Sequence, residues 1–166
     1  TGVLSISGKS GSNDNVSYGV NISYGSHITG GTSGTTSING YSQQTPYGFL
    51  AGVNISDAGT VVSTNGSNLS ITGTGGGNGS VGGNHGVQVF ADAIVTVGGT
   101  GNLWITGTGG SATAQSNNGI NIDGVNALVG TTSGNITLNG TGGGSGTASF
   151  GVGVSVGNGG DVLAGG

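Results

Sequence analysis

The 166-residue sequence contains no cysteine, no methionine and no arginine, and only one lysine and one proline. The lack of cysteine excludes disulfide bonds and metal sites built on thiolates. Contacts to the phosphates of nucleic acids, and to anionic lipid headgroups, need lysine or arginine. Because Lys9 is the only basic residue of either kind, we expect no nucleic-acid partner.

Charge of either sign and long apolar runs are also scarce. Charged residues make up 4% of the chain, against about 25% in ordinary soluble domains. No apolar run approaches the roughly 18 residues of a membrane-spanning helix, so we expect no membrane insertion. The chain shows neither a signal peptide nor an initiator methionine, and we interpret it as a processed product or an excerpt of a longer protein. The net charge of −4 comes from Lys9 and five aspartates, Asp14, Asp57, Asp92, Asp123 and Asp161.

Glycine is abundant, with 43 residues, and a composition rich in Gly, Ser, Thr and Asn is typical of disordered linkers. Here, however, apolar residues recur with a period of about 33 residues, which indicates a repeat protein. The period predicts one domain of five repeats, with boundaries close to 1–34, 35–67, 68–101, 102–134 and 135–166. A short apolar segment ends at Gly8, Gly40, Gly73, Gly107 and Gly140, and a second segment begins at Gly19, Gly52, Gly86, Gly119 and Gly151.

Within each repeat, apolar and polar residues alternate, which is the mark of a β-strand with one buried face. No stretch shows the helical period. The first segment gives the predicted core column Ile6, Ile38, Ile71, Ile105 and Leu138. The second segment gives two predicted columns: Val20, Val53, Val87, Ile120 and Val152, and then Ile22, Ile55, Val89, Ile122 and Val154. A third segment is expected to contribute Ile28, Val61, Ile94, Leu128 and Val162.

Three short strands cannot enclose their own apolar residues, so each repeat must bury them against its neighbours. Stacking one repeat on the next gives every strand two hydrogen-bonded partners and places like side chains on like. The sequence therefore predicts an all-β fold, a parallel β-helix (β-solenoid) of five coils with three short strands per coil. The glycine-rich links between the first and second strands are expected to be variable surface loops, in which Asn117→Asp would be nearly silent.

Three repeats share a motif that is found outside this chain. They read "NLSITGTGGG" at 68–77, "NLWITGTGG" at 102–110 and "NITLNGTGGG" at 135–144, each followed by a line of the "GV-I" type. These resemble the repeats of filamentous haemagglutinin-like and autotransporter-like bacterial exoproteins. The resemblance implies a right-handed β-helical stalk of a secreted or cell-surface fibre. It supplies no catalytic residue.

No arrangement of residues that usually carries catalysis or metal binding is present. Asp57, Asp92, Asp123 and Asp161 do not fall at one position of the repeat, which favours roles in turns. Asp57 and Asp92 could still approach each other as an active pair. His27 and His85 lie in different segments and are expected at the surface. We therefore expect no enzyme, no catalytic residue, no cofactor and no metal site.

Aromatic and hydroxyl side chains are the candidates for surface contacts. Trp104 occupies an outward position between Leu103 and Ile105, where it could stack on a sugar, pack on a protein or be covered by its own chain. Tyr18, His85 and Phe150 each precede the glycine that opens the second segment. Two outward Ser/Thr ranks of the first segment vaguely resemble ice-binding arrays: Ser5, Ser37, Ser70, Trp104 and Thr137, beside Ser7, Asn39, Thr72, Thr106 and Asn139.

These features predict a structural building block of an extracellular, bacterial fibre, sheath or adhesin stalk. It would assemble end to end with copies of itself or continue into flanking repeats, because an open coil exposes strand edges. The alternative is a surface module that binds carbohydrate or ice on the Ser/Thr face. Glycans are therefore possible partners besides further coils of the same kind.

Overall fold

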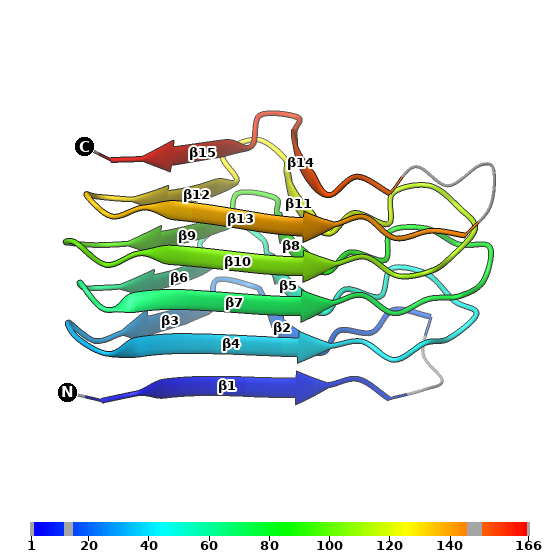
Figure 1. Ribbon diagram of the computed structural model, residues 1–166, viewed down its shortest axis with the longest axis horizontal. Coiled ribbons are helices and arrows are strands. Elements are labelled where there is room, and N and C mark those ends of the chain that lie inside the picture. The colour runs from blue at the N-terminus through cyan, green and yellow to red at the C-terminus, as the bar shows by residue number, and fades with distance from the viewer. Residues whose placement is uncertain (1, 12–14, 146–150, 166) are drawn as a thin grey trace.

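The computed structural model describes residues 2–11, 15–145 and 151–165, which form fifteen β-strands and no helix. The strands make three five-stranded parallel sheets, and the chain visits the sheets in turn. The predicted β-solenoid of five coils is therefore confirmed. In Figure 1 the front strands run left to right, the rear strands run right to left and the chain climbs, which is the right-handed sense.

Each sheet takes one strand from every coil. The first sheet contains β1 (Leu4–Lys9), β4 (Thr35–Tyr41), β7 (Asn68–Thr74), β10 (Leu103–Thr108) and β13 (Ile136–Thr141). The second contains β2 (Val20–Ile22), β5 (Val53–Ser56), β8 (Val87–Phe90), β11 (Ile120–Asp123) and β14 (Val154–Gly157). The third contains β3 (His27–Gly30), β6 (Val61–Thr64), β9 (Ile94–Val97), β12 (Leu128–Thr131) and β15 (Asp161–Ala164).

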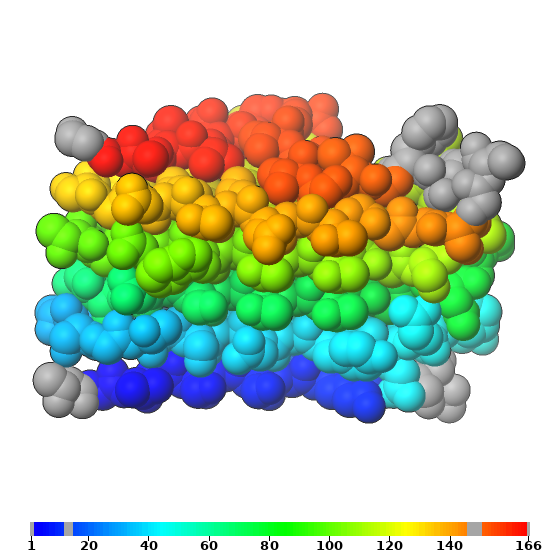
Figure 2. Space-filling view, in the orientation of Figure 1, coloured from blue at the N-terminus to red at the C-terminus, as the bar shows by residue number. Residues whose placement is uncertain are grey.

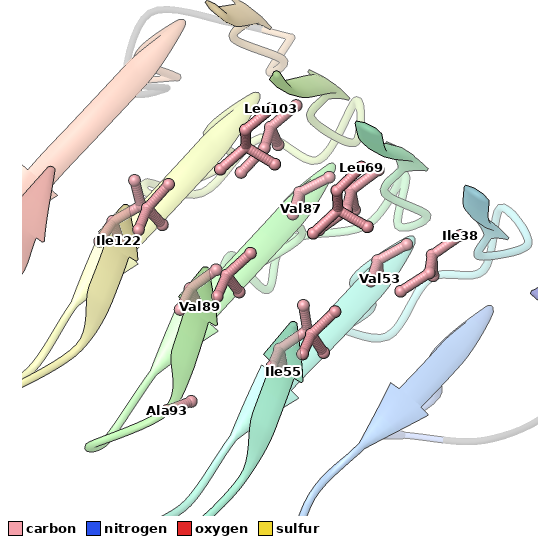
Figure 3. Packing of buried hydrophobic residues seen from close by; sticks show 14 of the residues in the cluster. Ile38, Val53, Ile55, Leu69, Val87, Val89, Ala93, Leu103 and Ile122 are labelled. Atoms are coloured by element: carbon pink, nitrogen blue, oxygen red, sulfur yellow. The ribbon is translucent and has the colours of Figure 1, made fainter. Parts of the chain in front are cut away.

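The apolar columns of the first sheet follow the prediction. Ile6, Ile38, Ile71, Ile105 and Leu138 occupy one register position along the five strands. Their side chains meet those of the second and third sheets in a single core, of which Figure 3 shows a part. The column is fully buried in the middle three coils and half-buried at Ile6 and Leu138, because each end coil has only one neighbouring coil.

In the second sheet the prediction is right for four coils and wrong for the fifth. Val154 pairs with Ile120 and Val156 pairs with Ile122, so the strand lies two residues later than predicted. Val152 lies outside the column and is 48% exposed. A shift of two residues keeps every side chain on its face, and the run from Gly151 to Val156 alternates throughout, so alternation could not decide between the two registers. The Ile120 N–H donates to the carbonyl of Gly153 at 2.9 Å, which makes Gly153 the equivalent of Gly119.

In the third sheet the predicted column was wrong by one residue in three coils. Ile28, Val62, Val95, Val129 and Val162 share one register position and point into the core. Val61, Ile94 and Leu128 lie on the other face of their strands and are half-buried. Each is followed or preceded by another apolar residue, so alternation gave no signal for which member of the pair points inward.

The glycine-rich links form a stacked unit of their own, here called the arm: residues 42–52, 75–86 and 109–119 of coils two, three and four. In Figure 1 these segments extend to the right of the sheets and return to the second sheet. Backbone hydrogen bonds join arm to arm, as from Gly110 N–H to the carbonyl of Asn84 at 2.8 Å. Leu50, Asn84 and Asn117 are fully buried there. The expectation that the links are surface loops was therefore wrong.

The arm leaves and rejoins each coil through a narrow neck. A Cβ built on Gly73 would collide with the carbonyl oxygen of Gly86, and one built on Gly86 would collide with the backbone of Thr108 in the next coil. The neck glycines of the other coils are packed in the same way, as at Gly40 and Gly52. The two recurring glycine columns of the sequence are thus explained by backbone segments that approach too closely for any side chain.

Candidate functional site

The outer face of the first sheet carries the two predicted Ser/Thr ranks in register. It is the front face in Figure 2. Trp104 stands in the rank of Ser37, Ser70 and Thr137 and is 38% exposed, so its predicted outward position is confirmed. The indole interrupts the flat array that an ice-binding surface would need. At the lower edge, the Lys9 ammonium lies over the Tyr41 ring, 5.5 Å from its centroid, within the range of a cation–π contact.

The outer face of the second sheet carries a column of amides. Asn21, Asn54, Gln88 and Asn121 share one register position, one per coil, as their spacing in the sequence indicated. The Asn54 Nδ2 donates to the Oδ1 of Asn21 at 2.8 Å and to the Oγ of Ser56 at 3.0 Å. Hydrogen bonds between coils therefore fix the orientation of the Asn54 amide.

These amides form the floor of a groove of about 690 Å³. One wall is made by the segments that enter the second sheet, with Tyr18 and the arm residues Phe49, Gly83 and Ser116. The opposite wall is made by the turns that leave the sheet, with Tyr24, Asp57, Phe90 and Asp123. The groove crosses coils one to four. It was missed at the level of sequence because its walls come from loops that differ between coils and share no motif.

Asp57, Asp92 and Asp123 each accept a hydrogen bond from a neighbouring coil. Asp57 accepts a hydrogen bond from the backbone N–H of Tyr24 at 3.2 Å. Asp92 accepts one from Asn126 Nδ2 at 2.9 Å, and Asp123 accepts one from Asn158 Nδ2 at 2.7 Å. These contacts tie coil to coil. Asp57 and Asp92 lie in turns, as expected, whereas Asp123 ends β11 and Asp161 begins β15, so the prediction of a turn role was wrong for these two. Asp57 lines the groove, whereas Asp92 does not, so the groove does not unite the pair considered from sequence.

The two histidines differ in environment. His27 is exposed, as expected. His85 is only 6% exposed, so the prediction of a surface residue was wrong for it. Its Nδ1 accepts the backbone N–H of Asn118 at 3.3 Å, which leaves the proton of the neutral ring on Nε2. Burial lowers the pKa of His85 to about 4, against an opposing effect of the Asp123 carboxylate. His85 is thus a neutral structural residue at neutral pH.

Tyr18, His85 and Phe150 precede the glycine that opens the second segment, but the structure does not give the three residues one common role. Tyr18 lines the groove beside His85, and burial first, then the charge of Asp57, raises the pKa of the Tyr18 hydroxyl. Phe150 lies outside the described residues. With the corrected register, the residue before the equivalent glycine in coil five is Val152.

Within residues 2–11, 15–145 and 151–165, no three His, Asp or Glu side chains gather as metal ligands would, and no helix is long and apolar enough to cross a membrane. Comparison with protein-family models, curated proteins and solved structures finds no match to this chain. The kinship with haemagglutinin-like exoproteins therefore stays a prediction.

Proposed function

We propose that the chain is a structural β-solenoid segment of an extracellular bacterial fibre, sheath or adhesin stalk. The observation that carries the proposal is the equivalence of the coils: along all five strands of the first sheet, an Ile/Leu core column and a glycine column each keep one register position. An interaction that repeats without change from coil to coil suits an object built by adding more of the same coils.

The outer coils offer the surfaces on which further coils would stack. Ile6 and Leu138 are half-buried, while their equivalents in the middle coils are fully buried. A coil placed above β13, whether from the same polypeptide or from a second copy, would cover this column and pair the strand edge. Such a contact is heterologous and does not close, so it extends into a filament.

The proposal is tested by electron microscopy and light scattering of the purified chain over a wide range of concentration. We expect filaments that grow with concentration and have an axial repeat of about 24 Å, the height of five strand spacings. A monodisperse monomer at every concentration would contradict end-to-end stacking of separate copies and restrict the proposal to coils that continue in one polypeptide.

A variant pair makes the test specific for coil stacking. The N–H groups of Asp161 and Gly165 donate to coil four, at 2.8 Å each. Bonds alternate between neighbours along a parallel strand, so the N–H of Ala164 points to the open edge of β15. Ala164→Pro removes this donor and should shorten the filaments, while the matched variant Ala164→Ser should leave them unchanged.

A further inference from the structure

We propose that the groove along the second sheet binds a neutral polysaccharide chain. This site lies on a different face from the Ser/Thr ranks and Trp104, and it is independent of whether the solenoid forms a fibre. The groove runs along the axis of the solenoid, because its floor takes one amide from each of coils one to four: Asn21, Asn54, Gln88 and Asn121.

The floor suits a ligand that is a repeating chain of hydroxyl groups. Amide side chains and sugar hydroxyls both donate and accept hydrogen bonds. Both donors of Asn54 are engaged by Asn21 and Ser56, and Asn54 and Asn121 are only 5% and 7% exposed. The exposed Asn21 and the half-buried Gln88 are therefore the amides of the floor that meet the ligand. The amides recur at the strand spacing of about 4.8 Å, which is on the order of the length of one sugar ring. The amide of Asn121 is held in place, since its Oδ1 accepts a hydrogen bond from Asn118 Nδ2 at 3.0 Å. The floor is therefore ordered before any ligand arrives, which lowers the entropic cost of binding.

The walls carry exposed aromatic rings, which is the second feature of the site. Tyr24 in coil one is 91% exposed, Phe49 in coil two is 58% exposed, and Phe90 in coil three is 39% exposed. Exposed apolar surface that borders a groove is typical of ligand-binding sites. The apolar C–H faces of a sugar ring pack against aromatic faces, while its hydroxyls stay free to reach the floor.

The backbone beneath two of these rings is unfavourable for an aromatic residue. Tyr24 has φ 56° and Phe49 has φ 59°, in the left-handed region that bulky residues rarely adopt. The equivalents of Tyr24 in the other coils, Asp57, Ala91, Gly124 and Asn158, also have positive φ and carry smaller side chains. The turn thus requires the conformation, but nothing in the fold requires the ring.

On the opposite wall, Phe49 is likewise an aromatic residue with positive φ whose equivalent in the next coil is smaller. Gly83 stands at its position in coil three, and both have positive φ. A Cβ built on Gly83 would lie 2.9 Å from Cδ1 of Phe49, so the ring rests directly on this glycine. Strained residues of this kind persist where they serve a function, and here the two strained rings border one groove from its two sides.

The charges of the groove select the class of glycan. Asp57 and Asp123 are among its lining residues, while no lysine or arginine is. Carboxylates accept hydrogen bonds from sugar hydroxyls and repel uronate or sulfate groups. The groove therefore fits a chain of neutral sugars and excludes an acidic polysaccharide.

The test is affinity electrophoresis of the natural chain in gels that contain dextran, galactomannan, mixed-linkage β-glucan or polygalacturonate. We expect retardation by at least one of the three neutral polysaccharides and none by polygalacturonate. Tyr24→Asn and Phe49→Asn should each weaken this retardation roughly tenfold, the effect of losing one buried ring. Asparagine tolerates positive φ and occurs naturally at the Tyr24 position as Asn158, so both variants should melt at the same temperature as the natural chain or higher.

The control is Trp104→Ser, which gives coil four the residue that coil three carries at Ser70. It should bind as the natural chain does. Three outcomes would overturn the proposal: no retardation by any neutral polysaccharide, full retention of binding by both asparagine variants, or loss of binding in Trp104→Ser alone. A lower melting temperature of the asparagine variants would also contradict it, because the rings would then serve the fold.

Discussion

The strand stack and the arm are held together by the same kind of coil-to-coil hydrogen bond, but their interiors differ. The stack buries columns of Val, Ile and Leu such as Ile71 and Ile122. The arm buries polar side chains, among them Asn84 and Asn117. Asn84 Nδ2 donates to Asn117 Oδ1 at 2.9 Å, and Asn117 Nδ2 donates to the carbonyl of Ala114 at 2.6 Å.

The difference lies in what each interior can tolerate. An apolar column is non-directional and accepts exchanges among Val, Ile and Leu, as the five coils themselves show. A buried amide is directional, because each donor and acceptor must find its partner or lose free energy. In this protein the arm is therefore the chemically more exacting region, although its composition resembles that of a disordered linker.

The largest effect is expected from a charge in the strand stack. Ile122→Asp places a carboxylate in a fully buried apolar column, and it should lower the free energy of unfolding by about 5 kcal/mol or prevent folding. Thr106→Asp, on the exposed face of β10, should change it by less than about 0.5 kcal/mol. Thermal and urea unfolding measure both. Equal effects would show that the inward face was assigned wrongly.

The arm is tested by the change that the sequence alone marked as harmless. Asn117→Asp removes both donors of the side chain and turns a carboxylate oxygen toward the carbonyls of Ala112 and Ala114. We expect a loss of about 4 kcal/mol. Gln115→Glu, the same chemical change at an exposed arm position, should be nearly silent. If both variants unfold like the natural chain, the arm is not a stacked unit.

The neck, where the two regions join, should show an intermediate effect. The Cβ of Gly73→Ala would collide with the backbone of Gly86, which cannot move without shifting the arm. Overpacking of this kind costs about 3 kcal/mol. At Gly31 a Cβ would have no neighbour closer than 3.9 Å, so Gly31→Ala serves as the control and should unfold at the same urea concentration as the natural chain.

The smallest effect is a pH dependence at the point where the arm enters β8. The pKa of His85 is about 4 in the fold and 6.5 in the unfolded chain. The unfolded chain therefore takes up the proton first as the pH falls, and the free energy of unfolding declines from pH 6.5 toward pH 4. At pH 5 the expected loss is about 2 kcal/mol relative to pH 7.5.

A pair of asparagine variants assigns this slope to one residue. His85→Asn introduces the residue that coil four carries as Asn118, and it should remove most of the decline between pH 6.5 and 5 in urea unfolding. His27→Asn changes an exposed histidine and should leave the decline intact. The assignment fails if the slopes of the two variants are alike.

The strand stack could be predicted from sequence to the extent that alternation carries the signal. In the first sheet, Ile38 and Ile71 are flanked by polar residues, and this alternation predicted the register correctly. Around Val152 and Val154 the alternation continues for too long, so it fixed the face and not the register. Val61 and Val62 are both apolar and adjacent, so the pattern did not indicate which of the two side chains points into the core. In each case the geometry of the adjoining turn sets the register or the buried face of the strand. A periodic pattern of apolar residues carries no information about that geometry.

The groove and the arm could not be predicted, for a different reason. Asn117 and His85 are buried although their side chains are polar, and Tyr24 and Phe49 are exposed although theirs are apolar. Both groups are exceptions to the rule that apolar residues are buried and polar residues are exposed, and the strand predictions depended on that rule. A partial signal exists in the spacing of Asn21, Asn54, Gln88 and Asn121, which recur once per repeat, but it carries no information about the walls on either side of them.

The constant spacing of the paired strands has a consequence for how the chain folds. Leu4 pairs with Thr36, and Leu69 pairs with Leu103, so partners are 32 and 34 residues apart at these two points. Each added coil closes a loop of the same length, at an entropic cost of about 3 kcal/mol, however many coils precede it. Contact order per coil thus stays fixed as the protein grows, and a coil that has formed serves as the template for the next. Folding can begin at any coil and spread to its neighbours, at a pace set by a single coil rather than by the length of the protein.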